Sequence, residues 1–216
     1  MPVYVVVRLQ PRPDCWHDTL DLIRQDLKRS PRLQRARLRA RVFQRLETPT
    51  ELLLIGEWES LAAYEQFRQT DVFAAVVGTG DVPPSICYFE RLTYFERMEE
   101  RAGAIACGTI IAAEADHAAL ESFVTTDGRA QTITAPGLIA HEIYRSLVPP
   151  RTYLVVHSWR HLTDLERYRQ RAGPEHERRL AALRATIDRF TGALVAEYSA
   201  SSQIASQLAP NTDISW

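Results

Sequence analysis

His157 is the residue of this sequence best suited to proton transfer. Apolar and β-branched residues predict a strand over residues 153–159, in which His157 and Trp159 point to the same face. An imidazole changes charge near neutral pH, so His157 could remove a proton from a phenol bound beside it. Trp159 could form an aromatic wall of the same site. Each also has a structural alternative, as a hydrogen-bonded histidine and a core tryptophan.

The stretch that contains His157 occurs twice. Residues 52–68 align with residues 153–169 without a gap, and Trp58 falls on Trp159. Each copy is an apolar run that ends in tryptophan and is followed by a polar break and a helical pattern. A repeat at about the spacing of one small domain indicates two domains of the same fold.

The two copies differ where chemistry would be expected. Gly56 stands at the position of His157, and Leu165 stands at the position of Tyr64. The hydroxyl of Tyr64 could donate a hydrogen bond to a substrate carbonyl. The sequence therefore predicts two pockets that are not equivalent, and it leaves open which of them is active.

Other polar and aromatic residues near these stretches could bind a substrate. His141 falls on the apolar face of its predicted strand, residues 138–147, where a core histidine bonded to a neighbour is the first interpretation. Tyr144, Tyr168 and Phe67 could equally be packing residues. The substrate-binding candidates are His141, Tyr144, Arg145, Phe67 and Tyr168. The catalytic candidates are His157, Tyr64, Trp159 and Trp58.

No metal site is expected. His157 and His161 have the spacing of a helical metal pair, but they lie at a strand end and a helix start, and no third ligand is evident. The three cysteines are too scattered for a zinc site or a disulfide framework. Residues 175–177 indicate a solvated first turn of a helix.

The element order that positions these residues is itself repeated. Hydrophobic periodicity predicts strand, helix, strand, strand, helix and strand in each half. The expected strands are residues 3–9, 38–46, 52–58, 86–95, 105–112, 138–147, 153–159 and 193–198. An additional helix is expected between Pro174 and Gly192, before the last strand.

This order is that of the ferredoxin-like βαββαβ unit, an α+β fold with helices on one face of an antiparallel sheet. The bare face of each sheet must be buried, so two units in one chain predict an intramolecular dimeric α+β barrel. We expect domains at residues 1–100 and 101–199, and a flexible tail at residues 200–216.

Charge and hydropathy exclude several partners. Lys and Arg number 26 against 27 Asp and Glu, a net charge of −1, which argues against nucleic-acid binding. Residues 24–45 are rich in arginine; a solvated face is the first interpretation and an anionic partner the second. No run has the pattern of a signal peptide or a membrane span, so a cytoplasmic protein without a membrane partner is expected.

Both halves resemble the antibiotic biosynthesis monooxygenase family, within the dimeric α+β barrel superfamily. The resemblance covers residues 3–97 and 104–199. It rests on Pro136-Gly137, Tyr144-Arg145 and the strand end at Trp159 in the second half, and on Glu57-Trp58-Glu59-Ser60 and Ala63-Tyr64-Glu65 in the first.

The resemblance implies a pocket between the sheet and the helices of each unit, lined by the tryptophan, and a small aromatic substrate. The best-known relatives oxidise polyphenolic, anthrone-like polyketides to quinones in secondary metabolism. They use O2 without metal or flavin, so no cofactor is expected. Arg68 and Arg169 stand near the position of the axial histidine of haem-degrading relatives, so haem is not expected either.

One departure from the family keeps other functions open. Tyr64 matches the family's tyrosine position, but Leu54 and Val155 replace the family's asparagine. A cyclase or isomerase that needs no O2, and a non-catalytic ligand-binding protein, are therefore alternatives. The two halves would form a pseudo-dimer, and two such chains could associate further.

Overall fold

The protein is described by a computed structural model that covers residues 2–28, 36–97, 102–148 and 151–199. The first unit contains β1 (Val3–Leu9), α1 (Trp16–Lys28), β2 (Arg37–Arg45), β3 (Leu52–Trp58), α3 (Leu61–Arg68), α4 (Asp71–Val77) and β4 (Ser85–Glu96). The second unit contains β5 (Ala104–Ile111), α5 (His117–Thr125), α6 (Asp127–Ile133), β6 (Leu138–Ser146), β7 (Thr152–Trp159), α7 (Leu162–Ala182) and β8 (Thr186–Ser199). Short 3-10 turns precede α1 and α5.

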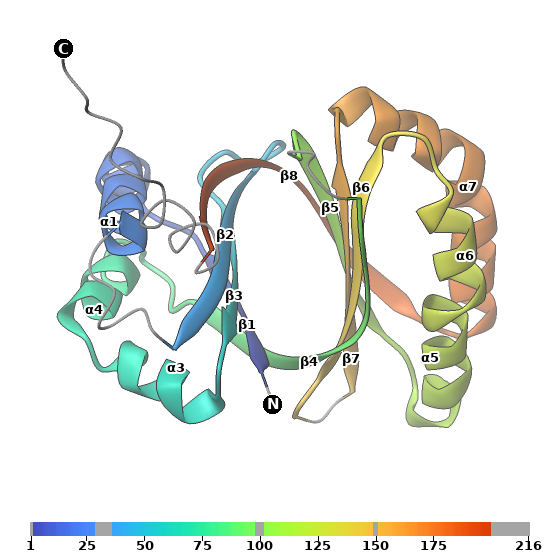
Figure 1. Ribbon diagram of the computed structural model, residues 1–216, viewed down its shortest axis with the longest axis horizontal. Helices are drawn as coiled ribbons and strands as arrows, with labels where there is room; N and C mark the ends of the chain where they lie inside the picture. Colours follow the sequence, from blue (N-terminus) through green and yellow to red (C-terminus); the bar gives the residue numbers. More distant parts are fainter. Residues whose placement is uncertain (1, 29–35, 98–101, 149–150, 200–216) are drawn as a thin grey trace, which may run out of the picture.

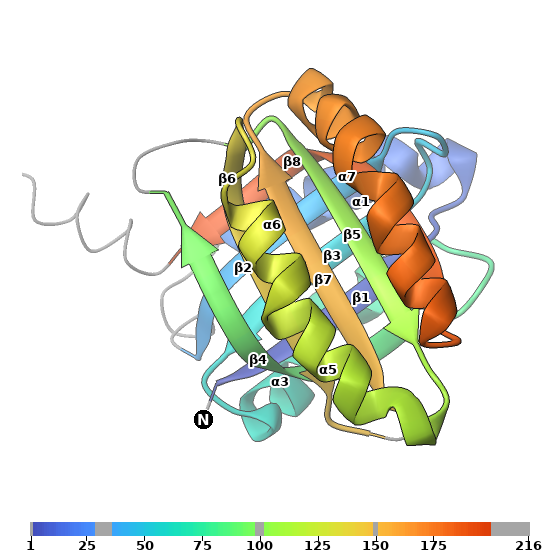
Figure 2. The same cartoon turned by 90° about the vertical axis from the view of Figure 1, so that its right-hand side faces the viewer.

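The eight strands form one closed barrel in the order β1-β3-β2-β8-β5-β7-β6-β4, with antiparallel neighbours. Helices α1, α3 and α4 cover the outside of the first sheet, and α5, α6 and α7 cover the second (Figures 1 and 2). The predicted α+β fold, with two ferredoxin-like units that form a barrel within one chain, is confirmed.

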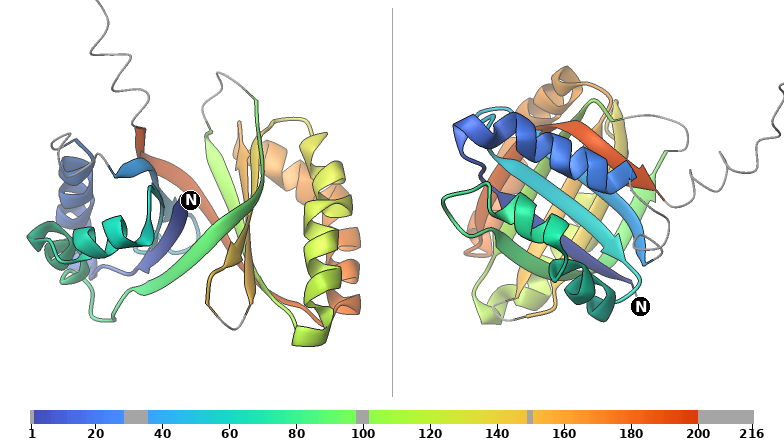
Figure 3. Two further views of the ribbon diagram at one scale, coloured as in Figure 1. Left: turned by 60° about the horizontal axis from the view of Figure 1, so that its bottom comes forward. Right: turned by 90° about the vertical axis from the view of Figure 1, so that its left-hand side faces the viewer.

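The last strand of each unit joins the two sheets. In β4, residues 85–89 pair with β1 and residues 89–96 pair with β6 of the other unit. In β8, residues 186–192 pair with β5 and residues 192–199 pair with β2. Gly192 lies at this crossing, where a Cβ atom would come within 2.7 Å of the Gln44 carbonyl oxygen. The long curved strands are visible on both sides of the barrel in Figure 3.

The end of the second unit differs from the prediction. Helix α7 continues through Pro174, so no separate helix begins there, and the chain turns at Arg184, which has a positive φ of 50°. Ile187 and Phe190 have a spacing of three that also suits a helix, but they belong to β8. Phe190 is completely buried in the barrel, so tertiary packing decides the strand.

The barrel interior is mostly apolar and holds a buried ion pair. Arg41 of β2 faces Glu142 of β6 with an Nη1–Oε1 distance of 2.7 Å, and the Tyr144 hydroxyl donates to the same carboxylate. Burial alone would lower the pKa of Arg41 and raise that of Glu142, but the facing opposite charges outweigh burial and keep both groups charged. The prediction of a solvated arginine face is therefore wrong at Arg41, because this face of β2 lines the barrel.

The part of the chain that the structure describes has no helix long and apolar enough to cross a membrane. The predicted domain boundary at residues 100 and 101 and the predicted tail at residues 200–216 fall outside the described residues.

Removing one partner of the buried pair should be costly. Arg41→Ala leaves Glu142 as an uncompensated buried charge, so we expect the free energy of unfolding in urea to fall by about 3–5 kcal/mol. Arg39→Ala is the control on the same strand, because its pair with Glu197 is partly exposed; its expected cost is about 0–1 kcal/mol. The double variant Arg41→Met/Glu142→Leu should lose less stability than Arg41→Ala, and an equal or larger loss would contradict this account.

Candidate functional site

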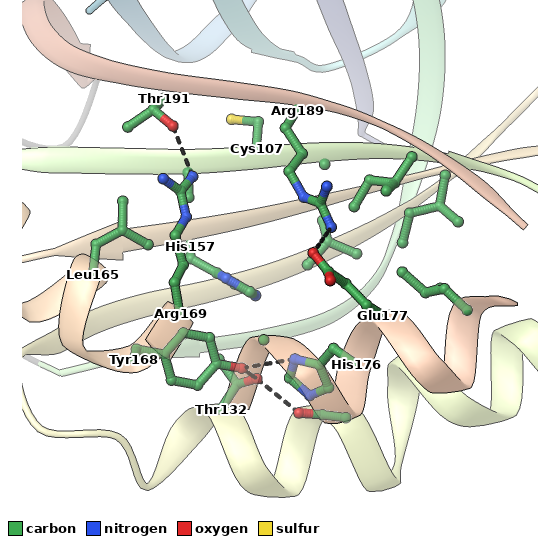
Figure 4. A pocket seen from close by; sticks show the side chains of 18 of the residues that line it. Cys107, Thr132, His157, Leu165, Tyr168, Arg169, His176, Glu177, Arg189 and Thr191 are labelled. Carbon is green, nitrogen blue, oxygen red and sulfur yellow. Dashed lines mark hydrogen bonds and ion pairs between the residues drawn. The ribbon is translucent and has the colours of Figure 1, made fainter. Parts of the chain in front are cut away.

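The second unit has a cavity of about 630 Å³ between its sheet and its helices. Strands β5, β6, β7 and β8 form one wall, and α5, α6 and α7 form the other. Arg45 and Glu47 of the first unit also reach the cavity, because β2 pairs with β8. Figure 4 shows the side chains from both walls around this space. A cavity of this volume can hold a ligand of several rings.

Two stacked histidines occupy the sheet wall. His141 and His157 are direct neighbours across β6 and β7, with ring centroids 4.9 Å apart and an angle of 26° between the rings. His141 is 2% exposed, and neither of its ring nitrogens has a hydrogen-bond partner among the described residues. The same holds for Nε2 of His157. These buried nitrogens are left without a partner within the described part of the chain, and a polar ligand group that reaches them would satisfy them.

Burial keeps both imidazoles neutral. The pKa of His141 is lowered to about 4, first by burial and then by the positive charge of Arg129. The pKa of His157 is lowered well below its usual value by burial and by His141, His176 and Arg169. Both rings are thus free bases at neutral pH, which is the form that can accept a proton.

A hydrogen-bonded group lines the helical wall. The hydroxyl of Tyr168 lies 2.7 Å from Thr132 Oγ1 and 3.3 Å from His176 Nδ1 (Figure 4). Burial raises the pKa of Tyr168 and lowers that of His176. His176 Nε2 has no hydrogen-bond partner within the described part of the chain. This wall therefore offers a phenol and an imidazole opposite the histidine pair.

His176 was missed by the sequence analysis, which placed residues 175–177 in a solvated turn. The signal was present, because Leu165, Tyr168, Ala172, His176 and Leu180 follow helical spacing. Pro174 obscures this pattern, because a proline is typical of a helix start, whereas here it lies inside α7. Arg169 and Arg189, which also line the cavity, were missed as site residues.

The corresponding space in the first unit is almost filled, with a cavity of only about 80 Å³. The Trp58 indole lies over Gly56, where a Cβ atom would be 2.7 Å from Nε1. The Arg37 guanidinium packs 4.8 Å from the Trp58 ring centre and 4.5 Å from that of Phe67, and it pairs with Asp26 at 2.7 Å. The two pockets are therefore unequal, and the roomy one is in the second unit.

The structure separates the predicted site residues into groups. His141, His157 and Tyr168 meet in the large cavity, whereas Trp58, Tyr64 and Phe67 meet in the small one. The Tyr64 hydroxyl is buried without a hydrogen-bond partner among the described residues, and burial raises its pKa.

Three predicted residues lie outside both cavities. Trp159 is completely buried behind Tyr168, with ring centroids 5.0 Å apart, so it supports the cavity wall without lining it. Tyr144 points into the barrel from the opposite face of β6. Arg145 is held by Glu90 and Glu121 at 2.6 and 3.0 Å. Tyr144, predicted as a pocket wall, and Arg145, predicted to bind the substrate, therefore line neither cavity.

Among the described residues, no group of three or more His, Cys, Asp or Glu side chains is arranged to hold a metal ion.

The close packing of Trp58 on Gly56 can be tested by a double-mutant cycle. Gly56→Ala should displace the indole, lower the free energy of unfolding by about 1–3 kcal/mol and alter the near-ultraviolet circular dichroism. In a Trp58→Phe background the added methyl group meets a smaller ring, so its cost should shrink. If Gly56→Ala lowers the free energy of unfolding equally in both backgrounds, the indole of Trp58 is not the reason why glycine is needed at position 56.

The neutral histidines predict a pH dependence of stability. Because the pKa of His141 is lower in the folded protein than its unfolded value of about 6.5, the unfolded chain binds more protons below that pH. Stability present above pH 6.5 is then lost as the pH falls towards 4, with about 2 kcal/mol lost between pH 7 and pH 5. Urea unfolding at both pH values should show a smaller loss in His141→Gln. Exposed His161→Gln should keep the full loss; equal losses in all three proteins would refute the prediction.

Comparison with known proteins agrees with this architecture. The family model for antibiotic biosynthesis monooxygenase matches residues 2–79 and 111–198, one match in each unit. No curated protein is detectably similar in sequence.

Several solved structures share the fold. An anthrone oxidase-like protein has a TM-score of 0.74 and 13% identity, covering 92% of this chain and 93% of that chain. A candidate monooxygenase from Fusobacterium nucleatum has a TM-score of 0.74 and 9% identity, covering 92% and 94%. A major regulator of staphylococcal pathogenesis has a TM-score of 0.55 and 10% identity, covering 91% and 100%. At these identities the likeness shows the fold alone; with the family match in both units, the chain belongs to the antibiotic biosynthesis monooxygenase family, as a tandem member with two units in one chain.

Proposed function

We propose that this protein is a cofactor-independent monooxygenase that oxidises a phenolic or polyketide-like aromatic substrate with O2 in the cavity of the second unit. The observation that carries the proposal is the stacked pair of His141 and His157, of which three ring nitrogens have no hydrogen-bond partner among the described residues, at a cavity of about 630 Å³. The family match supports the reaction class, and the solved relatives with monooxygenase in their names are consistent with it.

His157 acts as the base. Its Nε2 atom takes the proton of the phenol or enol, and the imidazolium is stabilised by the substrate anion formed beside it. The substrate anion passes one electron to O2, and the two radicals combine to form a C–O bond. Return of the proton gives a hydroperoxide.

The hydroperoxide then loses water to give a carbonyl group. A methylene carbon and O2 thus become a carbonyl and one water molecule, and the substrate supplies all four electrons. No external reductant enters this balance. The position of the cavity between the sheet and the helices limits the access of bulk water to the anion, and Tyr168 and His176 can hold the substrate oxygen that does not react.

One observation favours a second function. Val155 lines the cavity at the position where family members carry asparagine, so the cavity lacks that amide. The same proton abstraction without O2 would serve a cyclase or isomerase, and the fold shared with a regulator leaves a binding protein as the third alternative.

Oxygen consumption separates these functions. Chelator-treated protein is incubated with 1,8-dihydroxyanthrone or a dihydroxynaphthalene in an oxygen electrode, and the uncatalysed rate is subtracted. We expect His157→Ala to lower the catalysed rate by about 10²- to 10⁴-fold, because a general base is lost. His161→Ala, on the surface, is the control. Turnover that is equal in air and under nitrogen would instead support the cyclase, and tight binding without turnover would support the binding protein.

A further inference from the structure

Three arginines line the large cavity, and two of them already have carboxylate partners. Arg45 pairs with Glu51 at 2.7 Å. Arg189 pairs with Glu177 at 3.0 Å. Figure 4 shows the Arg189–Glu177 pair on one side of the cavity and Arg169 on the other. The positive charges of Arg45 and Arg189 are therefore each compensated by a carboxylate of the protein.

Arg169 is different. Its Nη2 atom donates to the Thr191 hydroxyl at 2.7 Å, and no carboxylate of the described residues forms an ion pair with it. Glu47 and Glu166 act on it only from a longer distance. Burial lowers the pKa of this half-buried guanidinium. A half-buried cation without a counter-ion is unfavourable, and an anion that enters the cavity removes that cost.

The surroundings of Arg169 fit one carboxylate. Thr191 accepts its hydrogen bond from Arg169, so its own hydroxyl proton can be donated to a second oxygen. A guanidinium and one hydroxyl match the charge and the two oxygens of a carboxylate. A phosphate carries more charge and more oxygens than this guanidinium and this hydroxyl match.

Arg169 also lies close enough to His157 for its charge to lower the pKa of that imidazole. Resting on the function proposed above, we propose that the substrate is an aromatic hydroxy acid whose carboxylate binds Arg169 and Thr191, with its hydroxyl-bearing ring towards His157. A bound carboxylate neutralises Arg169, which removes a repulsion that would oppose protonation of His157. Substrate binding and base strength are thereby linked.

Binding measured without turnover tests the inference. Isothermal titration under nitrogen compares 1-hydroxy-2-naphthoate with 1-hydroxy-2-naphthamide, which has the same shape and no charge. The wild-type protein should prefer the acid by about tenfold to hundredfold. Arg169→Met should abolish this preference, and Arg169→Lys should retain part of it. Arg178→Met should keep it, because that arginine is exposed, pairs with Glu175 and does not line the cavity.

The inference is overturned if the wild type binds acid and amide equally, if it binds neither, or if the preference survives in Arg169→Met. Circular dichroism of each variant checks that the fold is retained. The oxygen-electrode assay reports separately on the proposed function. If the protein prefers the acid but consumes no oxygen, the monooxygenase proposal is wrong and the carboxylate site stands. If it consumes oxygen but shows no preference for the acid, the carboxylate site is wrong and the monooxygenase proposal stands.

Discussion

The bare faces of two four-stranded sheets must be hidden from water, and the rest of the structure follows from how this is done. Cross-unit pairing of β2 with β8 and of β4 with β6 closes the barrel and leaves no open edge between the units. The barrel interior is then filled by side chains around Arg41 and Glu142. Ligand space is consequently found on the outer face of the sheet, beneath the helices, where the large cavity lies.

The two units share one fold, but the space beneath the helices is filled in the first unit and open in the second, and a few side chains make this difference. Without a Cβ at Gly56, the Trp58 indole lies across the sheet, and Arg37 fills what remains. In the second unit His157 stands at that position, Trp159 packs behind Tyr168, and the space stays open. Gly56 against His157 is thus one of the differences between a tryptophan that occupies the pocket and one that supports its wall.

The fold was predictable because strand parity and a repeat in register are local properties. The face of the strand on which His157 lies was predictable for the same reason. Its stacking on His141 could be predicted only by knowing that β6 and β7 are neighbours in the sheet. Arg41 could not be predicted as buried, since its partner lies 101 residues away in the other unit. The filling of the first pocket by Arg37 depends on side-chain packing, and Pro174 obscured the continuous helix that brings His176 to the cavity.

The covalent joining of the units has a consequence for how mutations act. In a dimer of identical chains, every substitution appears in both pockets, so an open cavity and its buried, unpaired histidines would be present twice. Here each pocket varies alone. The first unit can acquire well-packed residues that stabilise the folded chain, and the second can keep buried polar groups that destabilise it. A destabilising change in the first unit should therefore narrow the range of substitutions that the second unit tolerates.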